Sequence, residues 1–180
     1  MPDSHHSEGR LLVVLRHARA EAFAQDDHAR HLTDRGRRDA AGTGDWLRTQ
    51  GVVPDLALVS SASRTRETWA LVAEALGEAV ADTRTEVSDA VYSASPETVL
   101  DLLREVPAQH RVVAYVGHNP TAASLPQLLE DGEGDPLVFA RLSSGFAPAS
   151  VAVLRFEGEW ADLDEAGATL VALHAPGDPA

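Results

Sequence analysis

The chain has 180 residues, carries a formal charge of −13 at pH 7 and contains no cysteine. This length fits one ordinary domain with a full hydrophobic core, and the missing thiols exclude disulfides and thiolate metal sites. The acidic balance argues against a nucleic-acid partner, because binding to nucleic-acid phosphates depends on clustered Lys and Arg.

The two ends of the chain are polar and show no hydrophobic periodicity. We therefore expect flexible termini at residues 1–9 and 176–180, and a single domain over residues 10–175. No stretch approaches the roughly 20 apolar residues that a membrane span needs, and no signal-peptide pattern opens the sequence. These observations predict a cytoplasmic protein without a membrane partner.

The first expected element is a strand over residues 11–15, which is entirely aliphatic and runs directly into Arg16 and His17. Such a run is typical of a parallel strand buried on both faces. Open α/β sheets bind their ligands at the carboxyl ends of parallel strands. An isolated Arg-His pair is more often an ordinary polar strand end, so its meaning depends on the rest of the chain.

The next elements alternate between helices and buried strands. Residues 20–31 lack apolar spacing and are expected to form a loop. A helix follows over residues 33–50, with Thr33 as its N-cap. A second buried strand is predicted at residues 55–59, and the helix after it shows apolar residues at helical spacing and closes at Gly77.

The clearest helix start is Ser95-Pro96-Glu97, which combines a capping Ser, a Pro in the first turn and an acidic residue. A third buried strand is predicted at residues 111–116. After it, Asn119 is expected to cap a helix that opens at Pro120. Pro126 should kink or end that helix.

Two further strands, at residues 150–156 and 168–174, are expected to pair as an antiparallel hairpin. Strands that alternate with helices at this spacing indicate βαβ units. The sequence therefore predicts an α/β fold, a three-layer α/β/α sandwich around a mainly parallel central sheet.

Three of the predicted strands end next to cationic or imidazole side chains: Arg16 and His17, then Arg64, then His118. In a parallel sheet these strand ends lie on one edge, so the four side chains are expected to converge on one pocket. A guanidinium suits an anion because it never loses its proton, and a neutral histidine offers a ring nitrogen lone pair. Each residue alone has an ordinary structural explanation, but three coincident placements favour a functional site.

The motifs at these positions resemble those of the histidine phosphatase, or phosphoglycerate mutase-like, superfamily. The resemblance extends over residues 11–156 with the motifs in the family's order, and it implies the fold of that family. Ala18 stands where many members have Gly, with Glu21 soon after it, which resembles the bacterial SixA-type phosphohistidine phosphatases. The matching segments are Leu15-Arg16-His17-Ala18, Arg30-His31-Leu32-Thr33-Asp34-Arg35-Gly36, Ser60-Ser61-Ala62-Ser63-Arg64-Thr65-Arg66-Glu67-Thr68 and Gly117-His118-Asn119-Pro120.

By this resemblance His17 is the nucleophile that attacks phosphorus and becomes a phosphohistidine, which water then hydrolyses. Arg16, Arg64 and His118 would hold the phosphoryl oxygens during catalysis. The resemblance implies neither a metal ion nor another cofactor. The expected substrate-binding residues are Arg16, Arg30, Arg64, His118 and Asn119.

Asp27, His28 and His31 have a spacing compatible with a metal ion, but their loop offers no supporting second layer of ligands. We therefore expect no metal site there.

The general acid is where the chain departs from the family pattern. Mutase and alkyl phosphatase branches carry a carboxylic acid that protonates the leaving oxygen, and none aligns here. Glu21, Glu86 and Asp89 are the candidates, of which Glu21 is included among the catalytic residues, although each could also be an ordinary surface acid. An imidazole leaves phosphorus more readily than an alkoxide, so a site without a strong acid favours phosphohistidine over sugar phosphates.

The expected partner is a phosphorylated protein or a small phosphorylated metabolite. Little chain is available for lids, because residues 77–111 leave room for one short helix and loops, and residues 20–30 form a brief loop. An open site accepts a protein side chain, which favours a phosphohistidine phosphatase. Two alternatives stay open: a broad-specificity phosphomonoesterase for small molecules, and a catalytically weak phosphoprotein-binding module.

Overall fold

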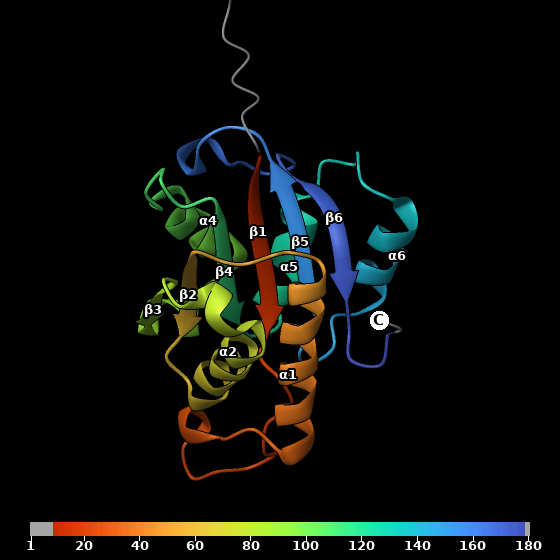
Figure 1. Cartoon of the computed structure of the whole chain (residues 1–180). Coiled ribbons are helices and arrows are strands. Elements are labelled where there is room, and N and C mark those ends of the chain that lie inside the picture. The colour runs from red at the N-terminus through yellow and green to blue at the C-terminus, as the bar shows by residue number, and fades with distance from the viewer. Residues whose placement is uncertain (1–8, 179–180) are drawn as a thin grey trace, which may run out of the picture.

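The computed structural model describes residues 9–178, and its centre is a six-stranded sheet (Figure 1). The strands are β1 (Arg10–Arg16), β2 (Leu56–Ser60), β3 (Arg84–Ser88), β4 (Val112–Gly117), β5 (Val151–Phe156) and β6 (Thr169–His174). They lie in the order β3-β2-β4-β1-β5-β6. The first four in this order run parallel, β5 is antiparallel to β1, and β6 is antiparallel to β5. The expected flexibility of residues 1–8 and 179–180 falls outside the described range.

Helices cover both faces of the sheet, with α1 and α2 on one side and α4 and α5 on the other (Figure 1). The predicted three-layer α/β/α sandwich with a mainly parallel sheet is confirmed. Within residues 9–178 no helix combines the length and the apolar character needed to cross a bilayer. The helices are α1 (Asp34–Thr49), α2 (Ser63–Leu76), α3 (Asp89–Tyr92), α4 (Pro96–Arg104), α5 (Thr121–Leu129) and α6 (Pro136–Ser144), with short 3-10 segments η1 (Asp27–Ala29), η2 (Gly77–Val80) and η3 (Trp160–Asp162).

The aliphatic run in β1 is explained by its central place in the sheet. Leu12 and Val14 pack into the core on the α4 and α5 side, and Val13 and Leu15 pack into the core on the α1 and α2 side. All four side chains are at most 1% exposed. Because successive strand residues point to opposite faces, a strand covered on both faces must be apolar throughout. The polar residues begin at Arg16, where this cover ends.

Among the strands and α-helices, three were not predicted from the sequence: β3, the short helix α3 and α6. β3 is a parallel edge strand that pairs only with β2, and its sequence Arg-Thr-Glu-Val-Ser carries no aliphatic run. An edge strand of this kind is stabilised by its hydrogen bonds to the neighbouring strand more than by burial, so a pattern of apolar residues does not reveal it. α6 begins after Asp135, whose carboxylate accepts from the Leu137 N–H.

The start of α5 also differs from the expectation. Pro120 is the N-cap residue, and no side chain caps the helix. The Asn119 amide instead donates to the Phe146 carbonyl at 3.2 Å, so Asn119 joins two loops rather than capping the helix. Pro126 lies inside α5, which continues to Leu129.

The α1–α2 contact gives a direct test of the packing. A methyl group at Gly44 would lie 2.6 Å from the Val72 carbonyl oxygen and 2.7 Å from the Ala75 Cβ. We predict that Gly44→Ala lowers the free energy of unfolding by about 1–3 kcal/mol, because the two helices must move apart.

Gly42 on the same helix is the matched control, since a methyl group there has no neighbour within 4 Å. Gly42→Ala should leave stability unchanged or raise it by up to about 1 kcal/mol, since Ala favours helix. Urea unfolding of both variants measures the difference. Equal effects at the two positions would contradict the packing described here.

Candidate active site

The carboxyl ends of β1, β2 and β4 open onto a cavity of about 710 Å³. The pairing of β1 with β4 places Arg16 opposite Gly117, and the His17 N–H donates to the Gly117 carbonyl at 3.0 Å. His17 and His118 therefore leave the sheet at the same level, with ring centroids 5.2 Å apart. The cavity is lined by Arg16, His17, Arg19, Ala20, Arg30, Arg64, Tyr92, His118, Asn119 and Pro148.

His17 is held as a neutral ring with one free nitrogen. Its Nδ1 lies 2.7 Å from the Ala18 carbonyl oxygen, which can only accept, so Nδ1 carries the proton and Nε2 keeps its lone pair. Burial, together with the nearby charges of Arg64 and Arg16, lowers the pKa of His17 to about 4, against the opposing effect of the Ala18 hydrogen bond. At neutral pH the ring is therefore uncharged, with a lone pair available on Nε2.

His118 is also neutral, for similar reasons. Burial lowers its pKa to about 3, and the Arg64 charge acts in the same direction. Its Nε2 lies 2.7 Å from the Ser60 hydroxyl at the end of β2. Its Nδ1 is buried and has no hydrogen-bond partner within residues 9–178.

The two arginines at the strand ends are oriented by backbone carbonyls. Arg16 Nη1 donates to the Phe146 carbonyl at 2.7 Å, and Arg64 Nη1 donates to the Asp27 carbonyl at 2.6 Å. Arg64 lies in the first turn of α2 and is 4% exposed. The Nε groups of both arginines are buried without a partner in the described part of the chain. Buried donors are nearly always satisfied, so unpaired ones around a cavity indicate a site for an anion.

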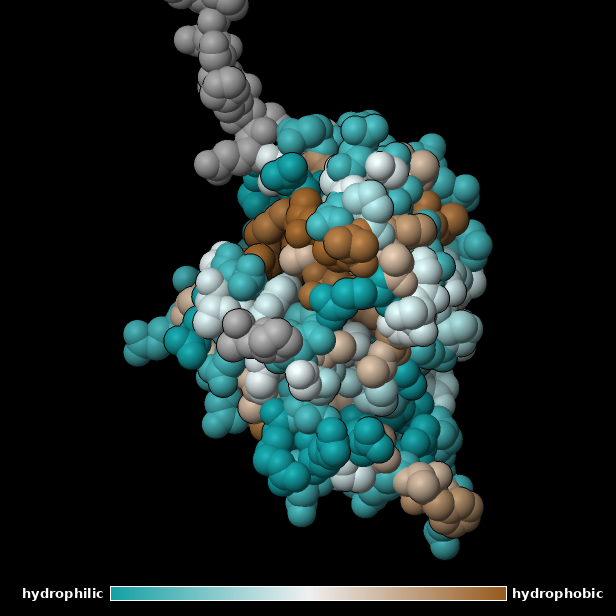
Figure 2. Space-filling view, turned by 90° about the vertical axis from the view of Figure 1, so that its right-hand side faces the viewer, coloured by the Kyte–Doolittle hydropathy of each residue, from teal (hydrophilic) through white to brown (hydrophobic). Residues whose placement is uncertain are grey.

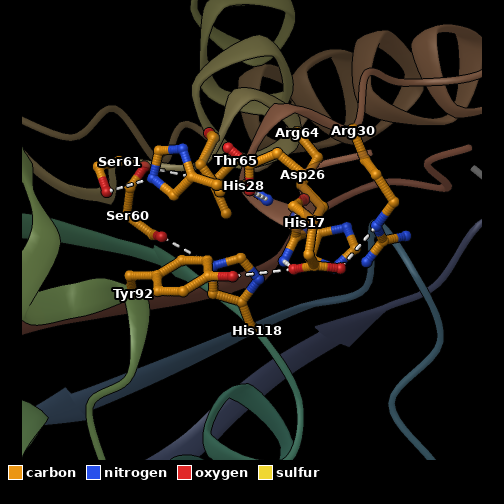
Figure 3. A network of polar contacts seen from close by, with 12 residues as sticks. His17, Asp26, His28, Arg30, Ser60, Ser61, Arg64, Thr65, Tyr92 and His118 are labelled. Atoms are coloured by element: carbon orange, nitrogen blue, oxygen red, sulfur yellow. Dashed lines mark hydrogen bonds and ion pairs between the residues drawn. The ribbon is translucent and has the colours of Figure 1, made fainter. Parts of the chain in front are cut away.

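Asp27 connects the cationic side of the cavity. Its carboxylate accepts from Arg64 Nη2 at 3.0 Å, from Arg30 Nε at 2.8 Å and from the Tyr92 hydroxyl at 2.9 Å. Figure 3 shows Arg30, Arg64 and Tyr92 near His17 and His118. The Tyr92 hydrogen bond, followed by the Arg64 and Arg30 charges, lowers the pKa of Asp27 to about 2. The Tyr92 ring also meets the His118 ring edge-on, with centroids 5.3 Å apart.

Six of the predicted site residues line this cavity, and Glu21 does not. Glu21 is exposed, and its carboxylate accepts from the His31 N–H at 3.2 Å. The other two acid candidates are also outside the lining: Glu86 pairs with Arg84 at 2.8 Å, and Asp89 accepts from Ser61. The six are Arg16, His17, Arg30, Arg64, His118 and Asn119.

The sequence analysis did not identify Tyr92 as a site residue. It also did not predict that Asp27 contacts the arginines of the cavity. Tyr92 ends the short helix α3, which carries no local signal of a site. Asp27 was considered only as a metal ligand together with His28 and His31. In the structure these three side chains have separate partners, since His28 contacts Ser61 and His31 contacts Glu67. Among residues 9–178 no group of three His, Asp or Glu side chains is arranged to hold a metal ion.

Comparison with known proteins identifies the family. A model of the histidine phosphatase superfamily (branch 1) matches residues 12–90. An uncharacterized protein of Mycobacterium tuberculosis is 34% identical over 165 residues, which cover 90% of this chain and 99% of the relative. The chain belongs to the histidine phosphatase superfamily.

Solved structures of the histidine phosphatase superfamily agree with this assignment. A proposed phosphohistidine phosphatase, SixA, from Nakamurella multipartitia has a TM-score of 0.82 and 33% identity, and the match covers 94% of this chain and 98% of that one. A second SixA, from Agrobacterium tumefaciens, has a TM-score of 0.73 and 30% identity, with 93% and 98% covered. The predicted family, its SixA-type branch and the phosphoglycerate mutase-like fold are confirmed, and the chain is a phosphatase.

The electrostatics of this histidine phosphatase site predict that both rings stay neutral well below pH 6.5. An NMR titration of the ring signals, assigned with a His17→Gln variant, should give midpoints of about 4 for His17 and about 3 for His118. A His17 midpoint near 6.5 would contradict the burial and charge environment described above.

The same shifts link folding to pH. Both folded pKa values lie below the ordinary value of 6.5, so the unfolded state binds more protons between about pH 4 and 6.5. The contribution of the two histidines to stability is complete above pH 6.5. It should be lost as the pH falls through this window.

Proposed function

We propose that the enzyme hydrolyses the phosphorylated histidine of a protein through a covalent intermediate on His17, without a metal ion. The observation that carries this proposal is the meeting of a neutral His17 with the guanidiniums of Arg16 and Arg64 at one cavity. A lone pair and fixed anion donors are the two requirements of phosphoryl transfer to a side chain.

In the first step the Nε2 lone pair of His17 attacks phosphorus. A P–N bond forms to His17 while the P–N bond to the substrate imidazole breaks. That imidazole, protonated on its other ring nitrogen, takes the bonding electron pair and leaves as a neutral ring. Charge on the three phosphoryl oxygens is stabilised by the guanidiniums of Arg16 and Arg64 and by His118. The His17 ring becomes cationic as it bonds to phosphorus. Its Nδ1–H then donates more strongly to the Ala18 carbonyl, because a charged donor makes the stronger hydrogen bond.

In the second step water attacks the phosphohistidine. The new P–O bond forms as the P–Nε2 bond breaks, the electron pair returns to Nε2, and inorganic phosphate leaves. The same donors hold the oxygens in both steps, so the site needs no rearrangement between them.

Among the described residues no carboxylic acid lines the cavity, which supports a P–N substrate. The carboxylates of Glu21, Glu86 and Asp89 lie outside the lining, and Asp27 is ionised at neutral pH. An alkoxide leaving group needs a strong acid beside it, whereas an imidazole protonated on its other ring nitrogen leaves as a stable neutral ring. The names of the two SixA neighbours, which are proposed phosphohistidine phosphatases, point in the same direction.

Removal of the nucleophile tests the intermediate. His17→Ala should lower phosphate release from a phosphohistidine peptide by roughly 10³-fold or more, because the covalent route is lost. The acid-labile phosphoenzyme of the wild type should disappear, while tungstate binding should persist. Unchanged turnover in this variant would overturn the proposal.

The arginine role has a matched control on the same helix. Arg64→Ala should lower kcat/KM by about 10²–10³-fold, as the loss of a charged donor to the transition state does. Arg66 is exposed two residues further along α2 and does not line the cavity, so Arg66→Ala should have little effect. Equal losses in both variants would argue against a specific role for Arg64.

The substrate class is tested by comparing kcat/KM for a phosphohistidine peptide, phenyl phosphate and a sugar phosphate. The peptide should be the best substrate and the sugar phosphate the poorest, in the order of leaving-group ability. The reverse order would instead indicate a broad phosphomonoesterase.

A further inference from the structure

The enzyme supplies its own negative charge to the cationic side of the cavity. Oδ2 of Asp27 accepts from Arg64 and Tyr92, and Oδ1 accepts from Arg30. Arg64, Arg30 and Tyr92 all line the cavity. One carboxylate of the chain therefore occupies the point at which three cavity donors meet.

The Asp27 carboxylate is ionised at neutral pH, and its charge acts on His118 in the cavity. The Tyr92 hydrogen bond and the two arginines hold the pKa of Asp27 at about 2. The Asp27 charge also raises the pKa of His118, against the larger lowering by burial. A ligand beside His118 is therefore exposed to a fixed negative charge.

The segment that carries Asp27 is anchored on both sides of this residue. Asp26 caps η1, with its carboxylate accepting from the His28 N–H at 3.0 Å. The His28 ring lies 2.8 Å from the Ser61 hydroxyl, which donates in turn to Asp89. The contacts of its neighbours Asp26 and His28 therefore help to hold Asp27 in place.

A second anionic group on a small substrate would meet two penalties here. Arg64 Nη2 and Arg30 Nε already donate to the Asp27 carboxylate. That carboxylate also repels a second negative charge on the ligand. A substrate whose leaving group is uncharged, such as the imidazole of a protein histidine, meets neither penalty. The Tyr92 ring, which lies against both His28 and His118 with centroids 5.0 and 5.3 Å away, adds an aromatic wall on this side.

We propose that Asp27 is a specificity-determining residue that excludes phosphorylated metabolites carrying a second negative charge near the transferable phosphoryl group. This inference rests on the proposed function for its biological meaning. The effect of Asp27 on which ligands the cavity binds can be measured whether or not the proposed function is correct.

Two small ligands isolate the effect. Glycerol 3-phosphate and 3-phosphoglycerate share a three-carbon skeleton, and they differ in a neutral hydroxymethyl group against a carboxylate. For each protein we would measure the Kd of both ligands by calorimetry, and kcat/KM where turnover occurs. The quantity of interest is the ratio between the two ligands, because a general change in anion affinity cancels in it.

Asp27→Asn keeps a hydrogen-bond acceptor and removes the charge. This variant should raise the affinity for 3-phosphoglycerate relative to glycerol 3-phosphate by about tenfold. The effect is modest because the Asp27 side chain is exposed and solvent screens its charge. Asp26→Asn is the matched control, since it removes the same charge one residue away and Asn retains the cap. The control should change the ratio by less than about twofold.

An unchanged ratio in Asp27→Asn, with both ligands weakened equally, would overturn the inference and leave Asp27 as a positioning residue for the arginines. An equal shift in the Asp26→Asn control would also overturn it, because only net charge would then matter. Asp27→Ser serves if Asp27→Asn does not fold. A shifted Kd ratio in an enzyme that hydrolyses no substrate would support the role of Asp27 while refuting the proposed function, so the two failures are distinct.

Discussion

The parallel pairing of β1 with β4 is the constraint on which the whole site depends. Its register sets Arg16 against Gly117, so the residue that follows each of them leaves the sheet at the same height. The rings of His17 and His118, far apart in the chain, then lie 5.2 Å from each other. Gly117 is required at this point, because a Cβ there would lie 2.1 Å from the Tyr115 hydroxyl. The sheet thus brings the two histidine rings together through its own strand pairing.

Burial and positive charge act together on this pair. Both lower the histidine pKa values, which leaves the rings neutral, while guanidiniums remain charged under the same conditions. Burying the Arg64 guanidinium costs solvation free energy. Its hydrogen bonds to the Asp27 carboxylate and carbonyl offset this cost. The same carboxylate then limits what else Arg64 can bind. Stability of the cationic site and selectivity for its ligand are therefore consequences of one interaction.

Local patterns in the sequence were sufficient for most of the fold. The aliphatic runs that became β1, β2 and β4 report burial on both faces, and the N-caps Thr33 and Ser95 mark the starts of α1 and α4 as predicted. The hairpin of β5 and β6 is also confirmed. The edge strand β3 left no such signal, because its charged residues are exposed and its stability comes from β2.

The sequence by itself determined the family, five of the six strands and the residues at the strand ends, because strand-end positions follow from chain order and burial pattern alone. The tertiary structure decided the partners of exposed charged residues. Asp27 and Tyr92 are 65 positions apart, and the packing of η1 against α2 and of α3 against β2 brings them together beside Arg64. Glu21, a few residues away, contacts the His31 backbone instead. The orientation of a charged side chain in a loop depends on which distant donors surround it, and local periodicity carries no information about those.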